Sequence, residues 1–284
     1  MMYPEIDIIN LWLCKGYENM TQKQISVIVP TYKRKFLLER TLKSIYAQSY
    51  QNIQVVIIND NPDKEITQDD LDIDKTRDIT ISNNYENRGL ASCRNSGMKH
   101  STGDYFVFLD DDDILLPYAL EFRMHMLNKL NADIVYTRAL QDIWEKTNTG
   151  GYKSVHKQLY WDSPFDKDLI LIQNIAPCCC PLFSRKAWKD SDYYKLDKNL
   201  DTSEDFDFWI ALSRENYFHE LKLIDCECSY RKNKTQMTGT RDFGKAYPIM
   251  YKRWRNTAKN LKWVTEHQNN TLKRMGFNPE DYGL

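Results

Sequence analysis

Four consecutive aspartates, Asp110–Asp113, directly follow the apolar run 105–109. Adjacent carboxylates repel one another, so such a run is tolerated only in water or around a cation. Oxygen ligands favour hard ions such as Mg²⁺ or Mn²⁺, which proteins commonly share with substrate phosphates. Helix capping by Asp112 or Asp113 ahead of Pro117 explains only one or two of the four. The run therefore predicts a Mn²⁺ or Mg²⁺ site that receives a phosphate-bearing substrate.

The same run also fits phosphatase chemistry. An Asp-x-Asp motif after a strand occurs in enzymes whose first aspartate, here Asp110, forms an aspartyl-phosphate. Those enzymes usually carry the motif on their first strand, whereas two or three predicted strands precede it here. A metal-dependent, phosphatase-type hydrolase that uses Asp110 is therefore kept as an alternative.

A second acidic pair, Glu204 and Asp205, lies in the segment 202–209, which reads Thr-Ser-Glu-Asp-Phe-Asp-Phe-Trp. A carboxylate can take the proton of a hydroxyl group while its oxygen attacks a sugar carbon. The same spacing fits a capping box in which Thr202 or Ser203 begins a helix. Spacing alone favours the capping box.

The elements that must position these acids alternate along the first half of the chain. Buried strands are expected at 25–29, 53–58, 79–81, 105–109 and 133–136, and helices at 35–48, at 90–100 and after Pro117. Strands that alternate with helices predict a mostly parallel sheet flanked by helices. Ligands of such sheets bind beyond the carboxyl ends of the strands, which is where Asp110–Asp113 falls. After about residue 140 the pattern becomes less regular.

Composition bounds the class of protein. The chain has 284 residues and a formal net charge of −1, so we expect no nucleic-acid partner. Apolar residues make up 42% and charged residues 28%, which excludes wholesale disorder. Seven cysteines, including Cys178–Cys180, fit a reducing compartment and buried packing better than a disulfide framework. There is no signal-peptide pattern and no apolar run of the roughly 18 residues that span a bilayer, so a cytoplasmic protein is expected.

A series of motifs over residues 25–140 resembles glycosyltransferase family 2, and the motifs occur in the family's order. They lie at 26–34 (SVIVPTYKR), 41–48, 55–60 (VVIIND), 87–97 and 103–113. The resemblance implies an α/β fold of the GT-A type, with a mostly parallel central sheet flanked by helices. It also implies a less regular acceptor-binding half, and the C-terminal segment is expected to be helical.

The resemblance assigns the binding of the nucleotide-sugar to residues of these motifs. They are Pro30, Thr31, Tyr32, Arg34, Asp60, Arg88, Arg94, Asp110 and Asp111. In this assignment Asp60 accepts a hydrogen bond from the uracil imide, and Arg88 and Arg94 lie near the diphosphate or brace the site. The chain departs from the family at 59–62, where it reads Asn-Asp-Asn-Pro instead of two acids followed by Gly-Ser.

The family's metal and catalytic positions also have counterparts in this sequence. Asp112 corresponds to the metal ligand of the Asp-x-Asp motif, while Asp110 or Asp111 holds the ribose or the sugar. Asp205 corresponds to the catalytic base, with Glu204 as its neighbour. The resemblance reverses the preference for a simple capping box at this segment.

The function implied is inverting transfer of a sugar from a nucleotide-sugar, a UDP-sugar in the first instance, to a hydroxyl of a glycan or lipid-linked acceptor. Synthesis of a bacterial surface polysaccharide is the process that the resemblance suggests. A non-catalytic module that binds a sugar nucleotide is the third candidate, and the presence of both acidic segments argues against it.

Four segments follow from these patterns: a leader (1–23), a nucleotide-sugar-binding half (24–140), a half that binds acceptor and carries the base (141–240), and a basic, aromatic helical extension (241–284). Tyr160, Trp161 and Asn174 are candidates for the acceptor side, and Arg231 for the phosphates. The stretch 241–263 fits either a solvated amphipathic helix or peripheral contact with anionic lipid at the inner face of the membrane.

Overall fold

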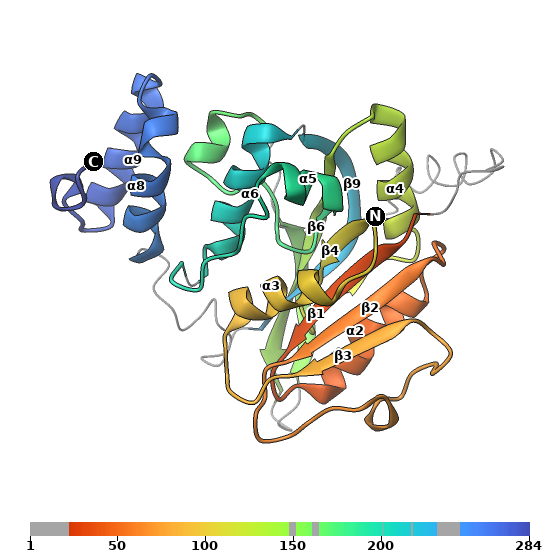
Figure 1. Ribbon diagram of the computed structural model, residues 1–284. Helices are drawn as coiled ribbons and strands as arrows, with labels where there is room; N and C mark the ends of the chain where they lie inside the picture. The colour runs from red at the N-terminus through yellow and green to blue at the C-terminus, as the bar shows by residue number, and fades with distance from the viewer. Residues whose placement is uncertain (1–22, 148–151, 161–164, 201, 217, 232–244) are drawn as a thin grey trace.

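The computed structural model describes residues 23–147, 152–160, 165–200, 202–216, 218–231 and 245–284 (Figure 1). Apart from Lys23, the expected leader lies outside these residues, and so do Trp161 and the segment 241–244. The side chains of Tyr160 and Arg231 are also outside the described part of the chain.

The first half of the chain forms a parallel sheet with the strand order β3-β2-β1-β4. Its strands are β1 (Ile25–Thr31), β2 (Ile53–Asn59), β3 (Ile79–Asn83) and β4 (Tyr105–Phe108). Every residue of β1 is buried, as expected for a strand covered on both faces. The strand order reverses between β1 and β4, so their carboxyl ends flank a switch point of the kind that binds ligands.

Helices α2 (Lys35–Tyr46) and α3 (Leu90–His100) cover opposite faces of this sheet (Figure 1). The β1–β2 and β3–β4 connections run in opposite directions along the sheet, so right-handed crossovers place their helices on opposite faces. Helix α3 packs very closely on β1 at Gly97. A Cβ atom at this position would lie only 2.2 Å from Cγ2 of Ile28. This approach holds the first turns of α3 over the carboxyl ends of the strands.

The second half extends the same sheet. Strand β8 (Pro181–Ser184) pairs antiparallel with β4 and with β6 (Ile134–Lys146), β9 (Phe218–Arg231) runs parallel to β6, and β5 (Ile114–Leu115) pairs antiparallel with β9. The predicted α/β fold with a mostly parallel central sheet flanked by helices is confirmed, and these strands are added to it.

A hairpin of β6 and β7 (Tyr152–Tyr160) occupies a region that the sequence predicts to be irregular. Residues 153–159 are all exposed. A strand without a buried face lacks the alternation of apolar and polar residues that identifies a strand in a sequence. Strand β7 is held by its antiparallel backbone pairing with β6.

The other described helices are α4 (Ala119–Leu130), α5 (Arg185–Asp190), α6 (Glu204–Glu215), α8 (Ala246–Ala258) and α9 (Lys262–Arg274), with short 3-10 turns η1 (Gln68–Asp70), η2 (Leu169–Leu171) and η4 (Pro279–Tyr282). The N-cap residue of α4 is Tyr118, so neither Asp112 nor Asp113 caps this helix. Among the described residues, no helix is long and apolar enough to cross a membrane.

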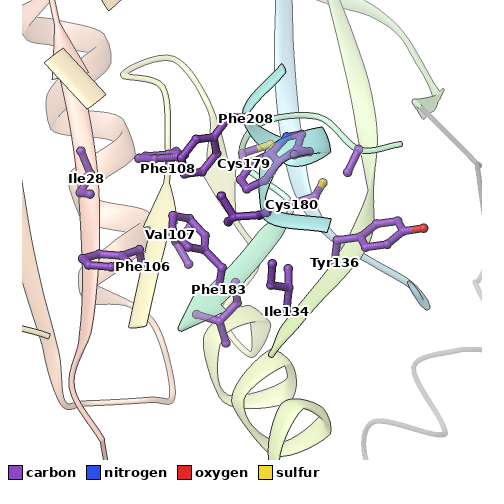
Figure 2. Packing of buried hydrophobic residues seen from close by; sticks show 14 of the residues in the cluster. Ile28, Phe106, Val107, Phe108, Ile134, Tyr136, Cys179, Cys180, Phe183 and Phe208 are labelled. Atoms are coloured by element: carbon purple, nitrogen blue, oxygen red, sulfur yellow. The ribbon is translucent and has the colours of Figure 1, made fainter. Parts of the chain in front are cut away.

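An aromatic cluster packs α6 against the sheet (Figure 2). The ring of Phe108 on β4 lies 5.4 Å from that of Phe183 on β8 and 5.9 Å from that of Phe208 on α6. Cys179 and Cys180 are buried beside this cluster, as expected. The cluster therefore fixes the start of α6 relative to the end of β4.

Helices α8 and α9 lie at one end of the molecule, beyond α6 (Figure 1). They attach to the 3-10 turn η2 and its C-cap residue. Gln268 donates to the carbonyl of Leu171 at 3.0 Å, and the Tyr251 hydroxyl donates to the carbonyl of Ile172 at 3.4 Å. The C-terminal helices are thus packed on the second half of the sheet domain.

Candidate functional site

A buried hydrogen bond joins the carboxyl ends of β1 and β4. The hydroxyl of Thr31, the last residue of β1, donates to Oδ2 of Asp111 at 2.6 Å. Burial raises the pKa of Asp111 to about 7, against the lowering effect of the nearby Arg34 guanidinium. Asp112 is 6% exposed and lies closer to solvent than Asp111, which is fully buried.

Arg34 at the N-cap of α2 forms ion pairs with both of these aspartates. Its Nη2 pairs with Oδ1 of Asp111, and its Nη1 lies 2.9 Å from Oδ2 of Asp112. Burial acts to lower the pKa of Arg34, but the two carboxylates outweigh it and the pKa is raised. From the following turn of α2, Arg40 donates to the backbone carbonyl of Asp112 at 2.8 Å. Helix α2 therefore holds the acidic segment in place.

Arg94 on α3 connects the two acidic segments. Its Nη2 lies 2.8 Å from Oδ1 of Asp110, and its Nη1 lies 2.7 Å from Oε1 of Glu204. The side chain is 2% exposed. Burial acts to lower the pKa of Arg94, but the surrounding carboxylates raise it well above the ordinary value. Arg94 is thus a charged brace between the end of β4 and the start of α6, one of the two roles expected for it.

Glu204 and Asp205 begin α6. The N-cap residue Ser203 makes no side-chain capping hydrogen bond, so the capping-box interpretation is not supported. Burial raises the pKa of Glu204 to about 7 and also raises the pKa of Asp205, while Arg94 opposes both shifts. Asp205 is only partly buried and accepts a hydrogen bond from Nδ2 of Asn174 at 3.3 Å. A partly accessible carboxyl with a raised pKa is a stronger proton acceptor than an ordinary aspartate.

Asp60 follows β2 and organises the turn before α3. Its Oδ1 accepts from the backbone N–H of Arg88, and its Oδ2 accepts from that of Gly89, both at 2.8 Å. Gly89 has φ 82°, a conformation that favours glycine. The N–H of Asp60 donates to the carbonyl of Thr31 at 2.9 Å. Asp60 therefore lies beside the switch point, whereas Arg88 contributes its backbone and its side chain is exposed.

The expected site residues divide into two groups. The structure brings together Thr31, Asp60, Arg34, Arg94, Asp110, Asp111, Asp112, Glu204 and Asp205 through the contacts above. Pro30 is buried within β1. Tyr32 is 42% exposed, and the Lys33 ammonium lies over its ring at 5.2 Å. Tyr32 and Arg88 thus face solvent and do not take part in the acidic network.

The acidic segment fits a divalent ion that is shared with a substrate. Among the described residues, no three His, Cys, Asp or Glu side chains are arranged to hold a metal ion on their own. Oxygens of Asp111 and Asp112 nevertheless converge on one guanidinium, which takes the place of a cation. Mg²⁺ and similar ions use one or two carboxylates and complete their coordination with substrate phosphates and water. This donor set fits Mn²⁺ or Mg²⁺ bound together with a diphosphate.

Two further residues, Cys178 and Asn174, lie near Asp205. Cys178 was grouped with its buried neighbours, but its thiol lies among the charges of the site. Burial raises the pKa of Cys178 well above its ordinary value, with Asp205 acting in the same direction and Arg94 opposing. Asn174 was placed on the acceptor side in general, and here it contacts Asp205 directly.

A cluster around Asp207 was missed by the sequence analysis. This buried carboxylate accepts hydrogen bonds from the Tyr194 hydroxyl at 2.8 Å, from Arg253 at 2.5 Å and from Trp254 Nε1 at 2.7 Å. Its spacing of three residues from Glu204 marked it as facing the same side of α6. Its partners could not be found, because they lie on a distant helix and a loop.

A cavity of about 550 Å³ lies next to this cluster and to α3. It is lined by Ser92 and Asn95 of α3, by residues 192–199 and by Arg253. The side-chain amide of Asn95 donates to the carbonyl of Leu196 at 2.7 Å, so α3 and the 192–199 segment are bound together at its wall. The sequence analysis assigned no role to this segment.

Comparison with known proteins agrees with this arrangement. Residues 26–191 match the model of Glycosyl transferase family 2. An uncharacterized glycosyltransferase of Rickettsia bellii is 30% identical over 223 residues, which make up 70% of this chain and 29% of that protein. A GalNAc(5)-diNAcBac-PP-undecaprenol beta-1,3-glucosyltransferase of Campylobacter jejuni is 25% identical over 231 residues, 79% of this chain and 71% of that protein. The chain thus spans under a third of the Rickettsia bellii relative.

Solved structures share the fold. S. aureus TarS 1–349 in complex with UDP-GlcNAc superposes with a TM-score of 0.59 at 17% identity, over 80% of this chain and 65% of that one. The mannosyltransferase PcManGT from Pyrobaculum calidifontis in complex with GDP-Man and Mn²⁺ superposes with a TM-score of 0.50 at 17% identity, over 86% of this chain and 66% of that one. Since the family model covers more than half of the 284 residues, Arg94 and the acidic segment Asp110–Asp113 among them, the chain belongs to glycosyltransferase family 2 and is a transferase of GT-A fold.

Proposed function

We propose that the protein transfers a sugar, with inversion, from a UDP-sugar to a hydroxyl of a glycan or lipid-linked acceptor, and that it acts in bacterial surface polysaccharide synthesis. One observation carries the proposal: the Arg94 guanidinium contacts both Asp110 at the end of β4 and Glu204 at the start of α6. A single transfer site needs donor-binding acids and a base within a few ångströms of one sugar carbon. The Arg94 bridge supports such a site, because one guanidinium holds Asp110 beside Glu204, the neighbour of the proposed base Asp205.

On the donor side, Asp112 would hold the divalent ion together with the donor's phosphate oxygens. A bound divalent ion neutralises charge that develops on the departing diphosphate. Asp60 is the group proposed to bind the uracil imide. Its oxygens already accept from the backbone N–H groups of Arg88 and Gly89 and from Nδ2 of Asn84, which hold the carboxylate beside the switch point.

On the acceptor side, Asp205 is the proposed base. The acceptor O–H proton passes to its carboxylate while the acceptor oxygen forms a bond to the anomeric carbon. The bond between that carbon and the phosphate oxygen breaks at the same time, and the nucleoside diphosphate leaves with the electron pair. Inversion follows because the attacking and leaving oxygens lie on opposite faces of the sugar. Glu204 stays bound to Arg94 and orients the first turn of α6.

The relatives support the substrate classes in this proposal. TarS was solved with UDP-GlcNAc, and PcManGT with GDP-Man and Mn²⁺, which supports a nucleotide-sugar donor and a divalent ion. The name of the Campylobacter jejuni relative contains a saccharide linked to undecaprenol through a pyrophosphate, which supports a lipid-linked acceptor.

We also propose a cytoplasmic location with peripheral contact between the C-terminal extension and anionic lipid. Exposed side chains that support such contact gather where α8 meets α9: Lys259, Lys262 and Trp263, of which Trp263 is 49% exposed. The division into a donor-binding half (24–140) and a half that carries the base (141–240) belongs to the same proposal.

A donor panel tests the proposed reaction. Wild-type protein with Mn²⁺ is incubated with UDP-, GDP- and other sugar nucleotides, and mass spectrometry follows the nucleotide released and the sugar transferred or hydrolysed. We expect Asp205→Asn to lower transfer on the order of 10³-fold, while nucleotide binding persists. Asp192→Asn, at an exposed aspartate, is the control and should behave as wild type.

The alternatives give different results in the same assay. A phosphatase-type hydrolase would release phosphate in a reaction that needs Asp110 and is indifferent to Asp205. A non-catalytic module would bind a sugar nucleotide without turnover of any donor. The ion pair between Asp110 and the buried Arg94 guanidinium favours the transferase, because it engages the carboxylate that a phosphatase needs as its nucleophile.

A further inference from the structure

The guanidinium of Arg34 occupies the position between two carboxylates of the acidic segment. It pairs with Asp111 on one side and lies 2.9 Å from Asp112 on the other. A guanidinium keeps its charge at every physiological pH and forms paired hydrogen bonds equally well with carboxylates and with phosphates. Arg34 therefore takes, in this structure, the place of the cation that Asp112 would bind in the proposed donor complex.

The backbone of Arg34 is anchored in α2, and its side chain is partly exposed. Its carbonyl accepts hydrogen bonds from the N–H groups of Leu37 and Leu38 at 2.9 and 3.0 Å, which anchor it at the start of α2. The preceding residue Lys33 has φ 58°, a left-handed conformation that is costly for a residue other than glycine. The side chain of Arg34 is 39% exposed, so its outer part borders on solvent.

We propose that Arg34 is an internal counter-cation that binds Asp111 and Asp112 in the donor-free protein and competes with the divalent ion for Asp112. The inference rests on the proposed donor site. When a diphosphate arrives with its ion, the ion takes Asp112 and the guanidinium moves to the diphosphate. No covalent bond changes in this exchange. The fixed backbone and the exposed side chain make a change of side-chain rotamer sufficient.

The charges around the site explain why such an exchange is useful. Arg94 is already bound to Asp110 and Glu204, so it cannot neutralise the other two carboxylates as well. Two aspartates without a cation would attract a free divalent ion on their own. Arg34 removes that attraction until phosphates are present, so the ion and the nucleotide bind together. By linkage, each then raises the affinity of the other by the same factor.

Binding of Mn²⁺ to the full-length chain tests this idea without any need for turnover. Free Mn²⁺ is measured by electron paramagnetic resonance during titration of wild type, Arg34→Gln, Arg34→Lys and Lys33→Gln. Lys33→Gln removes the same charge one residue away, where the exposed ammonium pairs with Asp63 at 2.6 Å. We expect Arg34→Gln to bind Mn²⁺ about tenfold more tightly than wild type, and Arg34→Lys and Lys33→Gln to remain close to wild type.

A second titration uses UDP and GDP in the presence of Mn²⁺. Here we expect the opposite sign for Arg34→Gln, with nucleotide affinity about fivefold lower because one phosphate contact is lost. If the Gln variant does not fold by circular dichroism, Arg34→Met replaces it with the same expected signs. Unchanged or weaker Mn²⁺ binding by the neutral variant overturns the proposal, as does an equal gain in Lys33→Gln.

The two titrations separate this inference from the proposed function. Failure of wild type to bind either nucleotide with Mn²⁺ contradicts the donor site itself, while the Mn²⁺ titration still decides whether Arg34 competes for the carboxylates. Normal nucleotide binding by wild type, together with no gain in Mn²⁺ affinity for Arg34→Gln, contradicts only the inference.

Discussion

Three of the aspartates after β4 have partners on α2, α3 and β1. Asp110 contacts Arg94, Asp111 accepts from Thr31, and Asp111 and Asp112 both pair with Arg34. The sequence identified the run as one acidic site, and the structure agrees with that grouping. The sequence could not show which residue binds each aspartate, because adjacent side chains point in different directions and their partners come from α2, α3 and β1.

The pH dependence of transfer belongs to the residue scale. Only the ionised form of a carboxyl accepts a proton, and burial raises the pKa of both Asp205 and Glu204, that of Glu204 to about 7. We therefore expect kcat/KM to rise with pH because the base must be ionised, with a fall of about tenfold per pH unit on the acid side, and we expect this fall to set in at higher pH than an ordinary aspartate would give. Initial rates from pH 5 to 9 measure this profile.

Glu204→Gln provides the diagnostic variant for that profile. It removes a like charge beside Asp205, so the pKa of Asp205 falls. The acid limb, which is the fall of kcat/KM on the acid side of the profile, then moves to lower pH. Glu215→Gln, at the exposed end of the same helix, should leave the limb where it is. An acid limb that is identical in wild type and Glu204→Gln would contradict the assignment of this pair.

At the scale of elements, α3 and α6 carry Arg94 and the two acids, and both helices are fixed by packing. The motif Arg94-Asn95-Ser96-Gly97 was recognised in the sequence, and the physical need for the glycine becomes visible only against β1. The polar strand β7 was missed because none of its residues 153–159 is buried. Sequence patterns thus revealed the buried strands of the first half, but they missed β7, which buries no face, and the short buried strand β8.

Replacement of Gly97 by alanine should destabilise the fold. The added Cβ would lie 2.2 Å from Cγ2 of Ile28, so α3 must move away from β1. We expect a loss of about 1–3 kcal/mol in the free energy of unfolding, measured with urea. Ser96→Ala, one residue earlier on the same helix, should change it by less than about 0.5 kcal/mol. Equal stability of Gly97→Ala and wild type would show that the close approach is wrong.

Arg253 fastens α8 to α6 through the buried Asp207 and to the 192–199 segment through Asp197, the latter at 2.6 Å. Arg253→Met leaves Asp207 buried with less compensation for its charge. We expect about 2 kcal/mol of destabilisation, since Arg253 itself is partly exposed. Lys252→Met, at the exposed neighbouring position, is the matched control and should unfold like wild type. Similar unfolding midpoints for both variants would contradict the claim that Arg253 stabilises the packing of α8 against α6.

At the scale of the whole molecule, one sheet joins two halves with different tasks. The parallel half was predictable because β1, β2 and β4 are nearly continuous buried runs, while β3 is a short, partly buried apolar run. The antiparallel half and the Asp207 cluster depend on contacts between distant segments, which no local pattern encodes. The two acidic segments lie in different halves, and Arg94 brings them together by a contact that spans 110 positions in the sequence.

The central claim is that one site binds a nucleoside diphosphate through a divalent ion at Asp112 and keeps Asp205 apart for the acceptor. Calorimetric titration of wild type, Asp112→Asn and Asp205→Asn with UDP and GDP, with and without Mn²⁺, tests it most directly. We expect binding of at least one nucleotide that requires Mn²⁺, falls about tenfold or more in Asp112→Asn, and persists in Asp205→Asn. Binding that is indifferent to Mn²⁺, or that is lost in Asp205→Asn and kept in Asp112→Asn, would contradict the account.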